Sequence, residues 1–104
     1  MKAPLHVTVD LCIIPIGTTL SISPYIAKCH ELLKTHHLTV TLHAFGTNIE
    51  GDWDTVFLAI KQCHELCHKL GVIRLSSTIK CGTRIDKKQS LQDKIDSVNK
   101  KIKT

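Results

Sequence analysis

Two cysteines and two histidines stand close together in the sequence, at Cys63, His64, Cys67 and His68. Residues four apart lie on the same face of a helix, so the cysteines form one pair and the histidines another. Zinc prefers such ligands, but the two pairs lie about 100 degrees apart around a helix, which opposes binding of one ion by all four. The spacing therefore favours buried cysteines that act as small apolar residues, with the histidines at the solvent edge. A metal-binding or redox-responsive role for these four residues is the alternative.

A second set of reactive side chains falls on alternate positions of predicted strands. Asp10, Cys12, His43 and Lys80 all occupy positions that point away from the predicted core. This arrangement admits an enzyme with an unrecognised site, including a nucleophilic pair of Cys12 and His43. No third group that would orient such a pair is identifiable, and nothing in the sequence places the two within hydrogen-bond reach. We therefore expect a protein that is not an enzyme.

Three segments combine glycine with small or polar residues near the predicted ends of strands: 15–18, 46–51 and 82–84. Small residues at such positions allow the backbone to approach a ligand closely. Turns also contain glycine for purely conformational reasons, so each segment taken alone says little about binding.

The excess positive charge is confined to the last quarter of the chain. The sequence has 14 Lys and Arg against 9 Asp and Glu, and the residues after Ile79 hold eight of the basic and three of the acidic ones. A basic segment is typical of nucleic-acid binding, but RNA-recognition sheets also stack bases on aromatic side chains. Aromatic residues make up only 4% of this chain. We therefore expect a solvated basic face and no nucleic-acid partner.

The length of 104 residues suits one domain, spanning residues 1–104. No apolar stretch approaches the roughly 20 residues that cross a bilayer, and the first residues lack the apolar core of a signal peptide. Five cysteines, an odd number in a chain without a recognisable export signal, indicate free thiols. We expect a cytoplasmic protein that does not contact the membrane.

The elements that must position these residues follow from hydrophobic periodicity. Alternation with a period of two predicts strands over 5–14, 38–45 and 72–81, and a short strand over 47–51 that pairs back as a hairpin. Apolar residues three and four apart predict three helices, over 23–36, 53–70 and 89–103. The expected caps are Ser23 for the first helix, Asp52 or Asp54 for the second, and a capping box of Ser90 and Asp93 for the third.

The order strand, helix, strand, strand, helix, strand predicts an α+β fold, a ferredoxin-like βαββαβ sandwich with an added C-terminal helix. Two helices would cover one face of an antiparallel sheet and leave a polar face open. The C-terminal helix has an apolar stripe that needs a surface to bury against, formed by Leu91, Ile95, Val98 and Ile102. The basic last quarter is therefore predicted to be an assembly element.

Several segments, in order and spacing, resemble the YkoF-like family of small thiamine-binding proteins; they are 15–17, 21–23, 46–51 with Trp53, 82–87 and 94–95. The resemblance extends over essentially the whole chain. It implies a ferredoxin-like fold, a homotetramer built as a dimer of dimers, no catalysis and no cofactor. It also implies a thiamine-like small molecule as ligand, either thiamine or its hydroxymethylpyrimidine moiety.

Carried over position by position, the resemblance implies ligand-binding residues after the first strand and in the hairpin: Ile16, Gly17, Thr18, Gly46, Thr47 and Glu50. Glu50 could accept a hydrogen bond from the pyrimidine amino group, and Thr47 or a glycine N–H could donate to a ring nitrogen. The alternative is structural: Glu50 would stabilise the start of the second helix, and Thr47 would be a turn residue. The segment 82–87 resembles an assembly or helix-docking motif more than a vitamin pocket.

Overall fold

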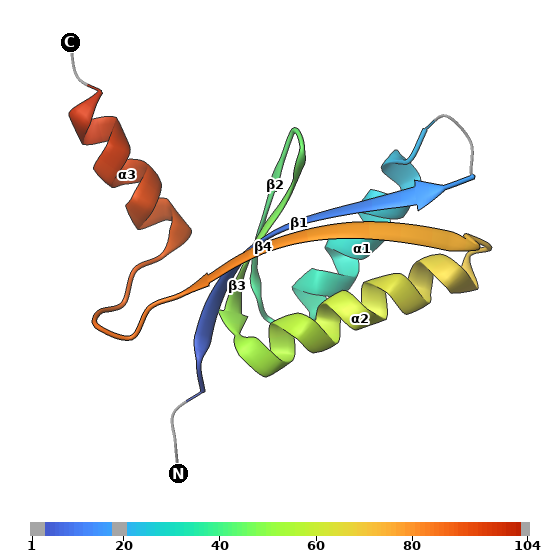
Figure 1. Ribbon diagram of the computed structural model, residues 1–104, viewed down its shortest axis with the longest axis horizontal. Helices are drawn as coiled ribbons and strands as arrows, with labels where there is room; N and C mark the ends of the chain where they lie inside the picture. Colours follow the sequence, from blue (N-terminus) through green and yellow to red (C-terminus); the bar gives the residue numbers. More distant parts are fainter. Residues whose placement is uncertain (1–3, 18–20, 103–104) are drawn as a thin grey trace.

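The structure, a computed structural model, describes residues 4–17 and 21–102 (Figure 1). Its elements follow the predicted order: β1 (His6–Ile16), α1 (Ser23–Thr35), β2 (Thr39–His43), β3 (Gly46–Asp52), α2 (Trp53–Lys69), β4 (Arg74–Thr83) and α3 (Leu91–Lys101). Within these described residues, no helix is long and apolar enough to cross a membrane.

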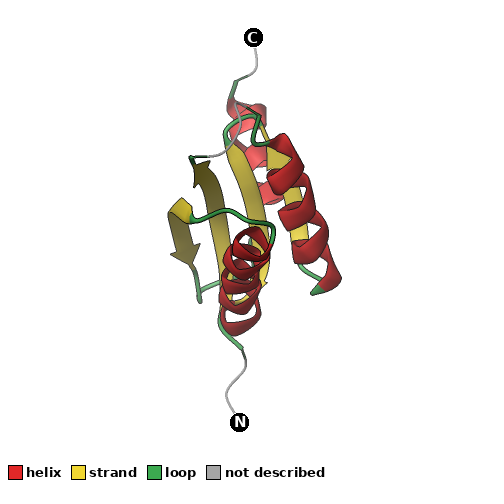
Figure 2. Cartoon of the chain, turned by 90° about the vertical axis from the view of Figure 1, so that its right-hand side faces the viewer, coloured by secondary structure: helices red, strands yellow, loops and turns green. Residues whose placement is uncertain are grey.

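The four strands form one antiparallel sheet in the order β2-β3-β1-β4. Helices α1 and α2 lie side by side on one face of this sheet (Figure 2). The predicted ferredoxin-like βαββαβ sandwich is therefore confirmed. Helix α3 stands apart from the α1–α2 layer, beyond the end of β4 (Figure 1).

Strict alternation along β1 explains where the core sits. Val7, Val9, Leu11 and Ile13 are at most 4% exposed and all point toward the helices, while the residues between them point to the opposite face. The core is completed from both helices and from their neighbours by Ile49, Cys29, Leu33, Val56, Ala59, Ile60, Cys63, Cys67 and Val72. Burial of these apolar side chains holds the covered face together.

The helix ends confirm two predicted caps and correct one. Asp52 caps α2 by accepting the Thr55 N–H at 2.9 Å, and Ser90 and Asp93 form the predicted capping box on α3. The prediction for Ser23 is wrong. Ile22 occupies the capping position of α1 without a side-chain hydrogen bond, and Ser23 is already the first helical residue.

Most element boundaries differ from those predicted by one or two residues, and β1 continues through Pro15 to Ile16 instead of ending at residue 14. Strand β2 ends at His43, because His43 pairs with Gly46 across a two-residue turn. Strand β4 begins at Arg74, because the Val72 N–H still bonds to the Cys67 oxygen and thereby belongs to the end of α2. Helix α3 is shorter at both ends than the predicted 89–103.

Candidate ligand-binding site

The open face of the sheet is a grid of polar side chains fixed by strand register. One row crosses the four strands as Gly82, Thr8, Glu50 and Thr39, and the next row as Lys80, Asp10, Asn48 and Thr41. Neighbouring strands lie about 4.8 Å apart, so each row brings hydrogen-bonding groups from distant parts of the sequence within a ligand's reach. Thr8 ties its own row together by donating to the Gly82 oxygen at 3.3 Å.

Asp10 and His43 are hydrogen-bonded to each other on this face. The distance from His43 Nε2 to Asp10 Oδ1 is 2.7 Å, and the Phe45 N–H donates to His43 Nδ1 at 3.3 Å. Because a backbone N–H can only donate, Nδ1 must be the acceptor, and Nε2 of the neutral ring then carries the proton that it donates to Asp10. Both ring nitrogens are therefore engaged within the chain.

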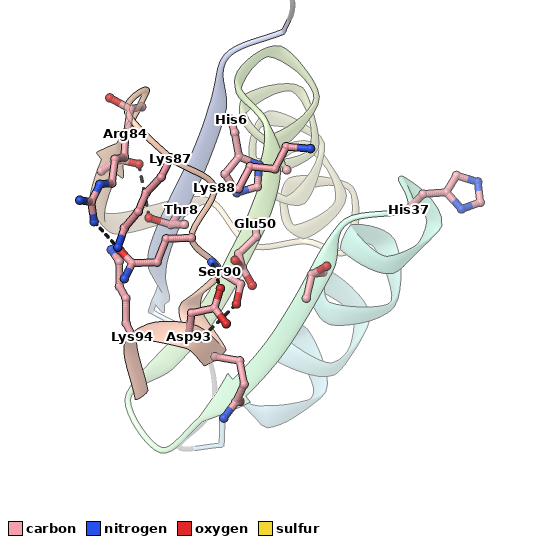
Figure 3. A pocket seen from close by; sticks show the side chains of 16 residues that line it. His6, Thr8, His37, Glu50, Arg84, Lys87, Lys88, Ser90, Asp93 and Lys94 are labelled. Carbon is pink, nitrogen blue, oxygen red and sulfur yellow. Dashed lines mark hydrogen bonds between the residues drawn. The ribbon is translucent and has the colours of Figure 1, made fainter. Parts of the chain in front are cut away.

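A pocket of about 1010 Å³ opens between the open face and the segment that leads into α3 (Figure 3). Its sheet side is lined by residues of β1, β2 and β3, among them His6, Thr8, Thr39 and Glu50. Its other side comes from the β4–α3 connection and the first turn of α3, with Arg84, Lys87, Lys88, Ser90, Asp93 and Lys94. We call this space the α3 pocket.

Glu50 links the sheet to α3 inside this pocket. Its Oε1 accepts the Leu91 N–H at 2.8 Å, so a carboxylate from β3 satisfies one of the amides that a helix N-terminus leaves unpaired. The capping box pairs two more backbone N–H groups. The Asp93 N–H donates to Ser90 Oγ and the Ser90 N–H donates to Asp93 Oδ2, each at 3.0 Å. The hydrogen bonds from the Ser90 backbone and hydroxyl hold the pKa of Asp93 below its ordinary value.

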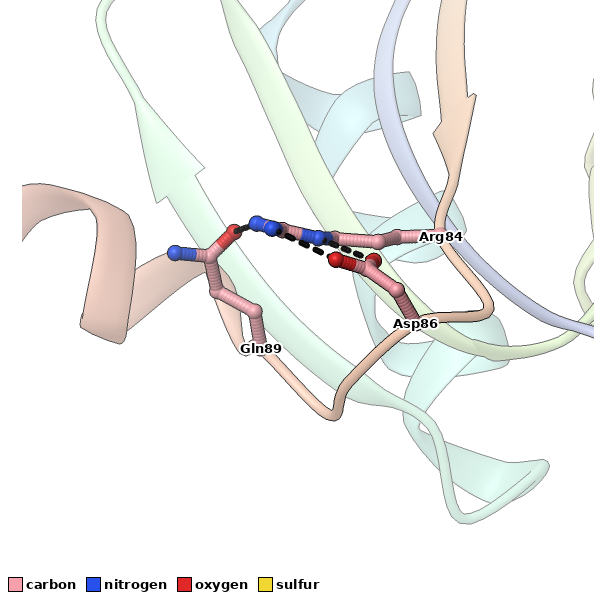
Figure 4. Close-up of polar contacts among 3 residues, drawn as sticks. All are labelled: Arg84, Asp86 and Gln89. Atoms are coloured by element: carbon pink, nitrogen blue, oxygen red, sulfur yellow. Dashed lines mark hydrogen bonds and ion pairs between the residues drawn. The ribbon is translucent and has the colours of Figure 1, made fainter.

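The connection between β4 and α3 is shaped by a second polar contact (Figure 4). Arg84 donates to both carboxylate oxygens of Asp86, with Nη2 to Oδ2 at 2.9 Å, and also donates through Nη1 to Gln89 Oε1 at 3.0 Å. Its hydrogen bonds to Asp86 raise the pKa of Arg84 and lower that of Asp86. Bidentate pairing of this kind fixes the plane of the guanidinium and the path of the loop around it.

Comparison with known proteins places this chain in a family. The sequence profile described as "Thiamine-binding protein" matches residues 9–99. The chain belongs to this family. It is 46% identical to the UPF0045 protein ECM15 of Eremothecium gossypii over 99 residues, which cover 94% of each chain. It is 48% identical to a UPF0045 protein of Synechocystis over 94 residues, 90% of this chain and 78% of the relative.

Solved structures of similar proteins agree with the fold of this thiamine-binding family member. The hypothetical protein MJ1052 of Methanocaldococcus jannaschii superposes with a TM-score of 0.84 at 33% identity, over 90% of this chain and 96% of the other. A candidate thiamine biosynthesis/salvage protein of Thermotoga maritima superposes with a TM-score of 0.75 at 13% identity, over 89% and 98% of the two chains. The second likeness bears on the fold alone.

The structure separates the six predicted ligand-binding residues of this family member. Gly46 and Glu50 share the open face, but Thr47 points to the opposite face, where it is 7% exposed against the core. Thr47 is also a strand residue, so the predicted alternative, a turn residue, is wrong. The two remaining described residues, Ile16 and Gly17, lie at the far end of β1.

Ile16 and Gly17 lie far from the α3 pocket, as the distance along β1 shows. Ile16 pairs with Arg74, whereas Thr8 pairs with Glu50. Eight residues at about 3.3 Å each place Ile16 roughly 26 Å from Thr8. Thr18 lies outside the described residues. One chain therefore brings together only Glu50 and Gly46 on one face of β3, and the binding role of all six residues stays a prediction.

Several pocket residues were not predicted as binding residues, namely His6, Thr8, Lys87, Lys88 and Lys94. Alternation along β1 is enough to place Thr8 on the open face, but alternation does not say where along a strand a ligand binds. The high proportion of basic residues after Ile79 was the sequence signal that could have indicated the lysines as binding residues. Their shared location follows only from the path of the loop before α3.

The cysteines and histidines of α2 have separate partners in this family member. Cys63 and Cys67 are at most 1% exposed in the core, and Cys67 Sγ lies 3.6 Å from Cys29 Sγ on α1. Burial raises the pKa of the Cys67 thiol to about 12, with the nearby Cys29 adding to the effect. A low-pKa reactive thiol requires the opposite environment.

The two histidines point elsewhere, since His64 Nε2 lies 3.1 Å from Ser77 Oγ and His68 Nδ1 lies 2.7 Å from the Val72 oxygen. The predicted division into buried cysteines and histidines nearer the solvent is thus observed. Across residues 4–17 and 21–102, no three His, Cys, Asp or Glu side chains are arranged to hold a metal ion.

Proposed function

We propose that this protein is a non-catalytic binding protein for thiamine or its hydroxymethylpyrimidine moiety, acting in the cytoplasm as an oligomer. The observation that carries the proposal is the match of the thiamine-binding family profile to residues 9–99. The α3 pocket, with a volume at the upper end of the usual range for small-molecule sites, supports it.

The chemistry of the pocket suits an aminopyrimidine. A carboxylate offers about four lone-pair sites, and the Leu91 N–H uses one of those on Glu50. The remaining sites can accept hydrogen bonds from an exocyclic amino group, and the negative charge favours a cationic thiazolium nearby. Thr39, beside Glu50 in the same row, supplies a hydroxyl that can donate to a ring nitrogen. Thr8, on the other side of Glu50, already donates to the Gly82 oxygen and can act as an acceptor.

The geometry of His43 supports a role without catalysis. Its two ring nitrogens are occupied by Asp10 and by the Phe45 N–H. A general base needs a ring nitrogen that can reach a substrate proton. Using His43 in this way would break one of two existing hydrogen bonds, so the Asp10–His43 pair is better suited to fixing the β2–β3 turn against β1.

Assembly is supported by the apolar side chains that α3 leaves uncovered. Ile95, Val98 and Ile102 are 47%, 56% and 64% exposed, and Ile85 in the preceding loop is 91% exposed. An apolar patch of this kind on a small protein is typical of a contact surface. We propose that a second copy of the chain covers it, within a tetramer arranged as a dimer of dimers.

Calorimetric titration with thiamine and with hydroxymethylpyrimidine tests the binding proposal. We expect saturable heat for at least one ligand, and a loss of about tenfold or more in affinity for Glu50→Gln, because an amide removes the charge and offers fewer acceptor sites. Gln still presents an oxygen to the Leu91 N–H, so the fold is retained. Glu65→Gln, an exposed change on α2, is the matched control and should bind as the unaltered protein does.

Two results would overturn the proposal. One is the absence of both heat and a thermal shift at millimolar ligand. The other is turnover of either compound by the purified protein, which would replace binding by catalysis.

A further inference from the structure

The α3 pocket is lined by charged groups of both signs. Its carboxylates, Glu50 and Asp93, lie at the sheet and at the start of α3. Both already accept hydrogen bonds from backbone amides at the start of that helix, Leu91 and Ser90. Its basic groups lie on the β4–α3 connection and on α3 itself, with Arg84, Lys87, Lys88 and Lys94 (Figure 3).

These basic groups are not equally available to a ligand. Arg84 is engaged by Asp86 and Gln89 (Figure 4), and Lys87 contributes to lowering the pKa of Asp86 and Asp93, after the larger effects of their hydrogen bonds. Lys88 and Lys94 form no ion pair with a carboxylate in the part of the chain that the structure describes. They therefore supply the positive charge that the protein itself leaves unbalanced.

Glu50 and the free lysines share one pocket because the chain returns to the sheet at the start of α3. From Gly82, on the other side of Thr8 from Glu50, the chain continues into the loop that bears Lys87 and Lys88. The Leu91 N–H then bonds to Glu50, three residues from Lys88 and three from Lys94. A ligand in the pocket would thus meet the Glu50 carboxylate and these lysines together.

We propose that the lysine side of the α3 pocket is a phosphate subsite, and that the ligand is a phosphate monoester of a thiamine-like molecule rather than the free alcohol. This inference rests on the proposed function, because it names the form of that ligand. Lysine is a strong point-charge partner for phosphate. The free alcohol carries only the thiazolium charge, and the same lysines repel that charge.

The helix N-terminus does not provide this subsite. Its Leu91 and Asp93 amides already donate to Glu50 and to Ser90 Oγ. A phosphate placed against those amides would also meet two carboxylates. The dianion is therefore held by side chains from the rim, and its affinity depends on salt concentration as expected for an exposed charge pair.

The test compares thiamine monophosphate, thiamine and inorganic pyrophosphate by calorimetry, at low and at high salt. The variant is Lys88→Gln with Lys94→Gln, and the matched control is Lys28→Gln with Lys61→Gln, which removes the same charge from exposed positions on α1 and α2. We expect the unaltered protein and the control to bind the monophosphate about tenfold tighter than thiamine. The pocket variant should lose this preference and bind thiamine at least as tightly as the unaltered protein does, because the repulsion of the thiazolium is removed. High salt should reduce the preference in the unaltered protein.

The outcomes separate the two proposals. Equal affinity for thiamine and its monophosphate, or a preference that survives in the pocket variant, overturns the subsite and leaves the proposed function standing. Lysine-dependent binding of pyrophosphate without any binding of thiamine supports the subsite and overturns the proposed function. Absence of binding by all three compounds overturns both.

Discussion

The two faces of the sheet are built on opposite principles, although they share the same strands. The covered face is apolar: Val7, Val9 and Ile49 are at most 2% exposed, and the helices seal them from water. The open face is polar and held at separate points by hydrogen bonds, such as the one between Asp10 and His43. Stability and ligand chemistry can therefore be assigned to alternate residues of one strand.

Helix α3 extends this difference. None of its described residues is buried, whereas α2 buries five. Its position relative to the sheet depends on the bond from Leu91 to Glu50 and on the loop organised by Arg84. A helix positioned by polar contacts at one end can respond to whatever occupies the pocket beside it, which a helix packed into a core cannot do.

The largest expected difference is between truncating an apolar side chain of the core and truncating one on α3. Leu33→Ala removes a side chain that is 1% exposed in the core, and we expect the free energy of unfolding to fall by about 2–5 kcal/mol. Ile95→Ala removes a side chain that is 47% exposed, and we expect a change within about 0.5 kcal/mol for the dilute single chain. Urea denaturation followed by far-ultraviolet circular dichroism measures both.

The dependence of the melting temperature on protein concentration tests whether a second copy covers α3. If a second copy covers α3, the melting temperature of the unaltered protein rises with concentration and Ile95→Ala weakens that rise. A loss above 2 kcal/mol for Ile95→Ala under dilute conditions would show that α3 is part of the core. The division between a packed core and a helix α3 that lies outside it would then be wrong.

An intermediate effect is expected on the open face itself. A Cβ on Gly46 would lie 2.8 Å from the Leu11 backbone oxygen and 3.1 Å from Asp10 Oδ1, so Gly46→Ala forces β1 and β3 apart. We expect a loss of about 1–3 kcal/mol in the free energy of unfolding. Gly82→Ala is the control on the same face, because its nearest neighbour, Thr8 Oγ1, would lie at an ordinary 3.8 Å.

Thermal denaturation of the two alanine variants gives a direct comparison. Equal melting temperatures for Gly46→Ala and Gly82→Ala would mean that the open face tolerates backbone shifts wherever they occur. The Asp10–His43 contact would then not be a fixed feature of the site.

The sequence was sufficient for the fold because local patterns and global architecture agree. Alternation in β1 predicted which residues face the helices, and Asp52 and the Ser90–Asp93 box marked helix starts through a side chain that accepts a nearby N–H. Ser23 shows where this reasoning fails. A serine before a proline resembles a cap, but here Ile22 takes that position.

The candidate site was less predictable, since it depends on non-local placement. Placing Thr47 and Glu50 together overlooked that residues three apart on a strand point to opposite faces. The partnership of Glu50 with Leu91 joins residues 41 apart in the sequence and has no local pattern. The proximity of Lys88 and Lys94 to Glu50 depends on the loop conformation held by Arg84, which periodicity does not encode.

The smallest effect on global stability, and the sharpest test of how the two regions communicate, comes from Glu50. Glu50→Ala removes the acceptor for the Leu91 N–H, whereas Glu50→Gln keeps an oxygen there. We expect amide hydrogen exchange within 91–101 to accelerate in the alanine variant, while the free energy of global unfolding falls by less than about 1 kcal/mol. Protection of β1 amides should fall by no more than the loss in global stability, because those amides exchange through global opening. Unaltered protection of α3 in Glu50→Ala would show that Glu50 does not anchor the helix, and the pocket wall would then be set by the loop around Arg84 alone.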